Sequence, residues 1–330
     1  HDDQSFGDDG DEAIIKCGTF TTSSTWGIAN AECGFEPQWL MYKRTDDTED
    51  WQMIDNMRGC GTQQVKWNGT DDSTQYSSVS ASNDQVLKAN TSAAEANEGR
   101  ADFHPTGFSV ATGGANDTYI YVAIRRGPMK EPDTNTDVLG ITTATTTAPL
   151  WKTGNTVDLG FYKYTSSSDV NLSARLLVGK QLKTNTTAAA TSDGTFLFDY
   201  QTGFYNNTFN SSSYIGYGLR RYPKVFDVVV YGGDGTSSRA INHNLGSTPS
   251  LAIWKSLTSA HEWTVINDPS SGPIYLASNA ARDTGTLING WSATTVTLGA
   301  AYVQTNNSSN NYLLLLFGSL DGISKVGTYT

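Results

Sequence analysis

Short apolar segments alternate with polar, turn-rich segments along the chain, and two stretches repeat the same order. The apolar segments 39–42 (WLMY) and 251–254 (LAIW) are each followed by a lysine, by a polar stretch (44–50 and 256–262) and by a tryptophan. An apolar run of this length bounded by turn-forming residues is typical of a β-strand. Each stretch therefore predicts a β-hairpin with the polar residues as its loop.

The two predicted hairpins belong to longer segments that align without gaps at a constant spacing of 212 residues. The matched positions are Gly34 with Gly246, Pro37 with Pro249, Lys43 with Lys255, Trp51 with Trp263, and Asp55 with Asn267. A second similarity links three segments, each a strand, an Asn-, Ser- or Gly-rich loop and a strand that opens on Tyr119, Tyr214 or Tyr312. Internal similarity at a fixed spacing indicates a repeat protein.

These matches predict an all-β chain of tandem antiparallel β-sandwich repeats of the jelly-roll or lectin-like kind. The first repeat is expected at 13–136, a divergent second at 137–225, and a third at 226–330. The composition agrees, because helix formers are scarce while Thr, Ser, Asn, Gly and aromatic residues are abundant.

The two ends of the chain are also similar to each other. Residues 14–21 read IIKCGTFT and residues 323–330 read ISKVGTYT. We therefore expect 323–330 to be the first strand of a further repeat, and residues 1–12 to be the end of a preceding repeat or a linker. On this interpretation the sequence is a window onto a longer array.

Charge and cysteine content narrow the functional classes. A formal charge of −11 argues against a nucleic-acid partner, whose binding would need clustered Lys and Arg. The apolar run 312–317 has the length of a strand, and no run is long enough for a membrane-spanning helix. Cys17, Cys33 and Cys60 form neither a disulfide framework nor a zinc motif, so we expect buried or idle thiols.

No sequence motif predicts a catalytic, cofactor or metal site. The chain has four histidines and no HExxH, GxSxG or phosphate-loop pattern. Asp46, Asp47, Glu49 and Asp50 crowd one predicted hairpin loop, which indicates a solvated or calcium-attracting loop. Glycoside cleavage is the alternative for such carboxylates, and it would require two buried ones about 5 to 10 Å apart.

Five residues are candidates for interface or ligand contacts. The doublets Arg125-Arg126 and Arg220-Arg221 close two equivalent predicted strands. Because successive strand residues face opposite ways, one arginine of each doublet should point inward or across an interface. It would pair there with a carboxylate of a neighbouring repeat, or alternatively clamp a sulfate or carboxylate ligand. Trp67, in the polar context VKWNGT, is the candidate for an exposed aromatic contact.

The repeated segments resemble a repeat found in virion proteins of marine bacteriophages. The resemblance rests on GFEPQWLMYKRTD from Gly34, MRG from Met57, NHNLGSTPSLAIWKS from Asn242, and YIYVAIRRGPMKEPDTNTDVL from Tyr119. It covers nearly the whole chain and is weak through 140–200. It carries no catalytic residue and no cofactor.

The resemblance implies a non-enzymatic virion structural protein, part of a tail fibre or tail-associated appendage that spaces and presents host-contact loops. Its implied partners are other virion proteins and further copies of itself, as a homotrimer, with a host cell-surface glycan or protein as the contact. It would be assembled in the host cytoplasm and then carried on the virion. A capsid decoration protein, and a carbohydrate-binding or carbohydrate-cleaving sandwich, remain alternatives.

Overall fold

The computed structural model describes residues 13–58, 84–98, 101–166, 168–177, 179–207 and 209–328. The chain divides into two compact units, His1–Met129 (unit 1) and Lys130–Thr330 (unit 2). Trp67 and Cys60 lie outside the described residues.

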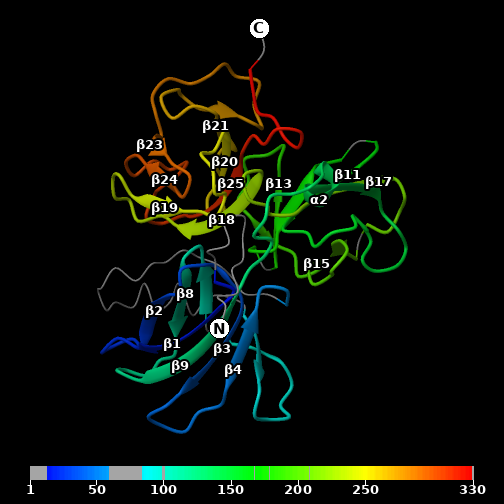
Figure 1. Cartoon of the computed structure of the whole chain (residues 1–330). Coiled ribbons are helices and arrows are strands. Elements are labelled where there is room, and N and C mark those ends of the chain that lie inside the picture. The colour runs from blue at the N-terminus through cyan, green and yellow to red at the C-terminus, as the bar shows by residue number, and fades with distance from the viewer. Residues whose placement is uncertain are drawn as a thin grey trace. The chain divides into compact units, whose positions relative to one another are not determined.

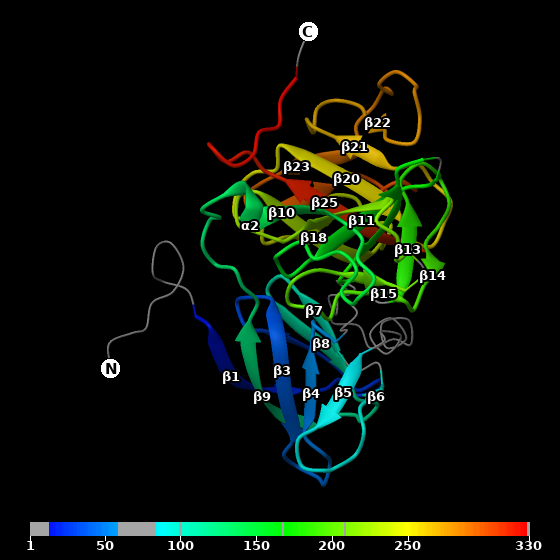
Figure 2. The same cartoon turned by 90° about the vertical axis from the view of Figure 1, so that its right-hand side faces the viewer.

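Unit 1 is a sandwich of two antiparallel sheets (Figures 1 and 2). Figure 2 shows the strands of the larger sheet side by side, and their order is β1 (Ile15–Thr21), β9 (Thr118–Arg125), β3 (Pro37–Arg44), β4 (Gln52–Asp55), β5 (Gln85–Lys88) and β6 (Ala96–Asn97). The smaller sheet has the order β2 (Ile28–Glu32), β8 (Gly107–Ala111) and β7 (Ala101–His104). Side chains from both sheets form one core, as expected for face-to-face sheets with alternating strands.

Unit 2 contains two further sandwiches with a related strand order and fewer strands. After the short helix α2 (Asn135–Val138), the first copy has a sheet of β10 (Leu139–Thr143), β17 (Tyr214–Leu219), β11 (Leu159–Tyr164), β12 (Asn171–Ala174), β13 (Lys180–Lys183) and β14 (Thr191–Ser192). Facing elements are β15 (Phe196–Leu197) and β16 (Tyr205–Asn206). The second copy has a sheet of β18 (Phe226–Gly232), β25 (Asn311–Phe317), β20 (Leu251–Ser256), β21 (Thr264–Ile266) and β22 (Ile274–Tyr275), and a facing sheet of β19 (Ala240–Asn242), β24 (Thr295–Leu298) and β23 (Ile288–Trp291).

In all three sandwiches the first strand of the larger sheet pairs with the last, and the last also pairs with the first strand of the following hairpin, which is β3, β11 or β20. The start of β1 lies beside the end of β9, and β10 and β18 pair in the same way with β17 and β25. The predicted all-β fold of tandem antiparallel sandwich repeats is therefore confirmed.

The two hairpins predicted from the constant spacing are present as β3–β4 and β20–β21. The glycines at the matched positions before them, Gly34 and Gly246, both have positive φ, +84° and +70°. Glycine reaches this conformation without the steric penalty of a Cβ, so the same turn leads into both hairpins.

A second glycine recurs for a different reason. A Cβ on Gly107 would lie 2.0 Å from the carbonyl oxygen of Ala31, and a Cβ on Gly203 would lie 2.0 Å from that of Trp151. Both glycines belong to the repeated Thr-Gly-Phe motif, and each lets two backbone segments approach closely, β2 and β8 in unit 1 and the isolated Trp151–Phe204 bridge in unit 2.

After β25, Leu320 and Ser324 form an isolated bridge, and the described residues 325–328 form no strand. The assignment of 323–330 to a further repeat therefore stays a prediction, and residues 1–12 lie outside the described ranges. Within those ranges no helical segment has both the length and the apolar character required to span a membrane.

Candidate functional site

The first arginine doublet lies at the end of β9 and contacts the turn before β3. The Arg125 guanidinium carbon lies 5.8 Å from the centroid of the Phe35 ring. The Arg126 Nε lies 3.4 Å from Oε1 of Glu36, a carboxylate that is only 4% exposed. The backbone N–H of Arg126 also donates to the Glu36 carbonyl at 2.9 Å. In unit 1 both arginines thus contact the segment leading into the predicted hairpin.

The second doublet divides between surface and interior. Arg220 is half-buried, with its guanidinium carbon 5.2 Å from the centroid of the Tyr222 ring. Arg221 is 2% exposed, and its Nε lies 2.6 Å from Oδ1 of Asp227, whose side chain is 1% exposed. Because Arg221 follows β17 and Asp227 lies on β18, this ion pair joins the two sandwiches of unit 2.

Further buried groups extend that ion pair into a network. Asp158 accepts the Arg221 backbone N–H at 2.7 Å, and its other oxygen lies 3.4 Å from Nε of Arg175. Arg175 donates to the carbonyls of Phe198 and Val157 at 2.5 and 2.6 Å. Burial lowers the pKa of Arg175. Two arginines and two carboxylates thus balance one another in the interior, which limits the cost of burying each charge.

The two sandwiches of unit 2 also share an apolar core. One cluster combines Leu172, Ala174 and Leu182 of the first sandwich with residues of β18 and β25. From the second sandwich, the Trp263 Nε1–H donates to the Lys183 carbonyl at 2.9 Å. The two sandwiches of unit 2 are therefore held together by apolar packing as well as by buried polar contacts.

Lys255 adds a buried cation to this junction. Its side chain is 0% exposed, and Nζ donates to the carbonyls of Thr187 at 2.9 Å and His261 at 2.6 Å. Burial lowers the pKa of Lys255 to about 8. Its counterpart at the matched position, Lys43, is half-buried and donates to the Arg44 carbonyl.

The tryptophans at the matched positions also differ in burial, with the one in unit 2 more buried than the one in unit 1. Trp263 is 1% exposed and lies in the shared core of unit 2, whereas Trp51 is half-buried in unit 1. The tryptophan at this repeat position is therefore a core residue in the third repeat, whereas in the first repeat it is only partly buried.

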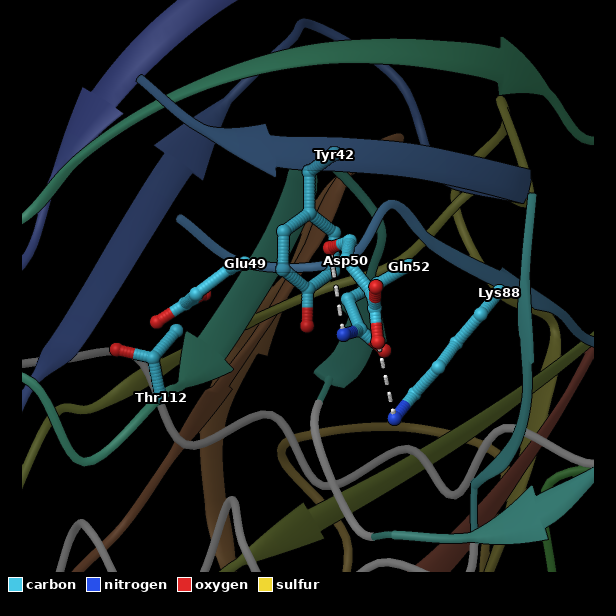
Figure 3. A pocket seen from close by; sticks show the side chains of 6 residues that line it. All are labelled: Tyr42, Glu49, Asp50, Gln52, Lys88 and Thr112. Carbon is cyan, nitrogen blue, oxygen red and sulfur yellow. Dashed lines mark hydrogen bonds and ion pairs between the residues drawn. The ribbon is translucent and has the colours of Figure 1, made fainter. Parts of the chain in front are cut away.

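A polar pocket of about 330 Å³ lies at the end of unit 1 near the β3–β4 loop (Figure 3). Its lining residues come from three strands and two loops: Tyr42 on β3, Glu49 and Asp50 in the β3–β4 loop, Gln52 at the start of β4, Lys88 at the end of β5, and Thr112 just after β8. Figure 3 shows the polar ends of the Asp50, Gln52 and Lys88 side chains on one side of the Tyr42 hydroxyl, and those of Glu49 and Thr112 on the other.

Ion pairs behind the pocket fix its acidic loop. Arg44 contacts Asp46 at 2.7 Å, Glu49 at 3.5 Å and Asp117 at 2.5 Å. The hydrogen bond from Arg44 lowers the pKa of Asp46. The Tyr119 hydroxyl donates to Oε2 of Glu49 at 3.3 Å, and burial raises the pKa of Tyr119 to about 12.

On the opposite wall, Asp50 is positioned by an amide and faces a loosely held ammonium. Asn90 Nδ2 donates to Oδ1 of Asp50 at 2.9 Å. Lys88 Nζ lies 3.6 Å from Oδ2 of Asp50 and 3.5 Å from Oε1 of Glu98, both longer than a normal hydrogen bond. The wall therefore presents a donor and an acceptor side by side.

The acidic loop is the one part of this pocket that the sequence predicts as a distinct feature. Gln52 carried a usable signal, since it is a polar residue at an inward position of β4, where Ile54 is the next buried residue. Lys88 carried none. Across the residues that the structure describes, no cluster of three or more His, Cys, Asp or Glu side chains is arranged to hold a metal ion.

Comparison of the chain with curated proteins and with solved structures gives no significant match. One protein family matches the chain twice, over residues 12–128 and 125–330, and these matches correspond to unit 1 and unit 2. The chain belongs to the family described as a domain of unknown function (DUF7483).

Proposed function

We propose that this chain is a non-enzymatic structural protein of a bacteriophage virion, part of a tail fibre or a tail-associated appendage. The observation that carries the proposal is the threefold recurrence of one sandwich topology in tandem. Tandem units stabilise one another mainly through their neighbours, so repetition suits a part whose task is spacing and presentation. The resemblance of the repeated segments to marine phage virion repeats supports the same role.

The junction inside unit 2 supports a mechanical task. A shared apolar core, the buried Arg221–Asp227 pair and the Lys255 contacts all connect its two sandwiches. Hinge motion at this junction would expose apolar surface and separate buried charges, both of which are unfavourable. A joint built in this way transmits force without bending, which a fibre or appendage requires.

The proposed partners are other virion proteins and further copies of this chain, assembled as a homotrimer by analogy with fibre proteins. The loops at the sandwich ends would make weak contacts with a host cell-surface glycan or protein. Repetition amplifies such contacts, because linked weak sites bind with much higher avidity than one site.

Purified particles of a phage that encodes this chain provide the test. We expect peptides of the chain in the particle digest, and immunogold labelling with an antibody to the chain at the tail. Label over the capsid shell would instead favour a decoration protein. Particles that contain no peptide of the chain would refute a virion role of either kind.

A further inference from the structure

We propose that the unit 1 pocket lined by Tyr42, Gln52 and Lys88 binds a neutral saccharide unit. This inference deepens the proposed function and rests on it, because it names the ligand class that the presented loops would take.

The first indication of a ligand is an unpaired acceptor. Gln52 is 9% exposed and lines the pocket, and its Oε1 accepts no hydrogen bond from the residues that the structure describes. Buried polar atoms in proteins are nearly always paired, so an exception at a pocket wall requires a reason. A ligand hydroxyl seated in the pocket would donate the missing hydrogen bond.

The second indication is the loose pairing of Lys88 with Asp50. At 3.6 Å the ammonium and the carboxylate are close enough to attract but too far apart for a good hydrogen bond. A hydroxyl group both donates and accepts, so one seated in the pocket beside this pair, within reach of both, would donate to Asp50 and accept from Lys88. Neighbouring hydroxyls of a sugar ring offer several such groups at fixed spacing.

The pocket is preorganised, because its acidic side chains are already held in place without a ligand. The Asn90 amide holds Oδ1 of Asp50, and Arg44 with Tyr119 holds Glu49 on the opposite wall. Groups that are already oriented lose little conformational entropy when a ligand binds. This preorganisation supports binding of a small rigid molecule.

Charge selects a neutral ligand. Two carboxylates, Glu49 and Asp50, face one ammonium, Lys88, so the lining carries a net negative charge. Like charge would repel a uronic acid, a sulfate or a phosphate, and an amine seated against Asp50 would lie beside the Lys88 ammonium and be repelled by it. An uncharged molecule rich in hydroxyls satisfies every lining group without a charge conflict.

Size and polarity set the expected affinity. A volume of about 330 Å³ is near the lower end of the roughly 300–1,000 Å³ range of ligand pockets, which suits one sugar unit with part of its neighbour. The lining side chains are mostly polar, so little apolar surface is buried on binding and we expect dissociation constants in the millimolar range. Several copies on one particle would raise the avidity.

Saturation-transfer NMR with the purified 330-residue chain tests the inference. The probes are the methyl glycosides of glucose, galactose and mannose, compared with glucuronic acid and glucosamine. Variants Asp50→Asn and Gln52→Met alter the pocket, and Asp47→Asn changes an exposed acid of the same loop that does not line it. Thermal unfolding of Gln52→Met checks the fold, which this near-isosteric change should preserve because it removes an unpaired buried acceptor.

We expect a signal from at least one neutral hexoside, a tenfold or greater loss of affinity in Asp50→Asn and Gln52→Met (roughly the effect of one hydrogen bond to a charged or buried group), and no loss in Asp47→Asn. No signal from any neutral hexoside, an equal signal in the folded pocket variants, or a stronger signal from glucuronic acid or glucosamine than from the neutral hexosides would each overturn the inference. The virion role is tested separately on particles, so either proposal can fail while the other stands.

Discussion

Replacing Arg221 with methionine should destabilise unit 2 by about 3–5 kcal/mol. Both partners of the Arg221–Asp227 pair are almost inaccessible, and their atoms meet at 2.6 Å. Methionine fills much of the arginine stem but leaves the Asp227 carboxylate without its cation in a water-poor junction. The backbone N–H of Arg221 still donates to Asp158, so the loss is confined to the guanidinium.

The neighbouring Arg220 supplies a matched control. Its guanidinium stacks on Tyr222 at a half-buried position, where a cation–π contact contributes about 0.5–1 kcal/mol. Arg220→Met should therefore lower the free energy of unfolding by no more than about 1 kcal/mol. Combining Arg221→Met with Asp227→Asn should recover at least about 2 kcal/mol of the loss, because the double variant buries no unpaired charge and the amide oxygen introduced by Asp227→Asn can still accept the Asn244 N–H.

Urea denaturation of the full chain, followed by hydrogen exchange of peptides from β17 and β18, measures these differences. Peptides from unit 1 serve as an internal reference, since their exchange should not change. If Arg221→Met loses no more stability than Arg220→Met, or if the double variant recovers nothing, the buried pair is not what secures the junction.

Three further predictions address separate features. Lys255 is protonated in both the folded and the unfolded chain below pH 8, so its burial penalty is fully present there. As the pH rises from 8 to 10.5 the folded state loses the proton first, and the free energy of unfolding should increase relative to Lys255→Met by up to about 3 kcal/mol, measured by urea titration at each pH. Gly107→Ala should lower the stability of unit 1 by about 1–3 kcal/mol in thermal melts, because its Cβ would strike a backbone carbonyl. Gly194→Ala in unit 2 places a Cβ that meets no atom within 4 Å, so it should leave the stability of unit 2 unchanged. A loss in unit 2 equal to that in unit 1 would contradict the close-approach argument. Iodoacetamide should modify the exposed Cys17 faster than the buried Cys33, whose pKa burial raises, and mass spectrometry would show the reverse order if Cys33 were accessible.

The strands could be predicted because their signals are local. The apolar runs before Lys43 and Lys255, and the tyrosines Tyr119 and Tyr312 near the starts of β9 and β25, each reflect a constraint within a few residues. Repetition strengthened these predictions, because a weak strand pattern is better supported when it recurs at a constant spacing. The fold class followed from such patterns.

The side-chain networks could not be predicted, because they depend on how distant segments pack. The sequence marks Arg220 and Arg221 as a pair but not which of them is buried, and that choice depends on the position of Asp227 in the next sandwich. Arg175 and Asp158 stand alone in a divergent region and carry no motif. The pocket is similar, since its walls come from residues up to 70 positions apart along the chain, between Tyr42 and Thr112.

The pairing of first and last strands has an evolutionary consequence. In each sandwich the chain comes in and leaves through two adjacent strands at one edge of the larger sheet. A gene segment that encodes one such cassette can be duplicated, lost or exchanged by recombination without opening the hydrogen-bonded ladder of either neighbour. The two sandwiches of unit 2 share an apolar core and the buried Arg221–Asp227 pair, so such an exchange would move them together, and the divergence of the second sandwich must stay compatible with the third.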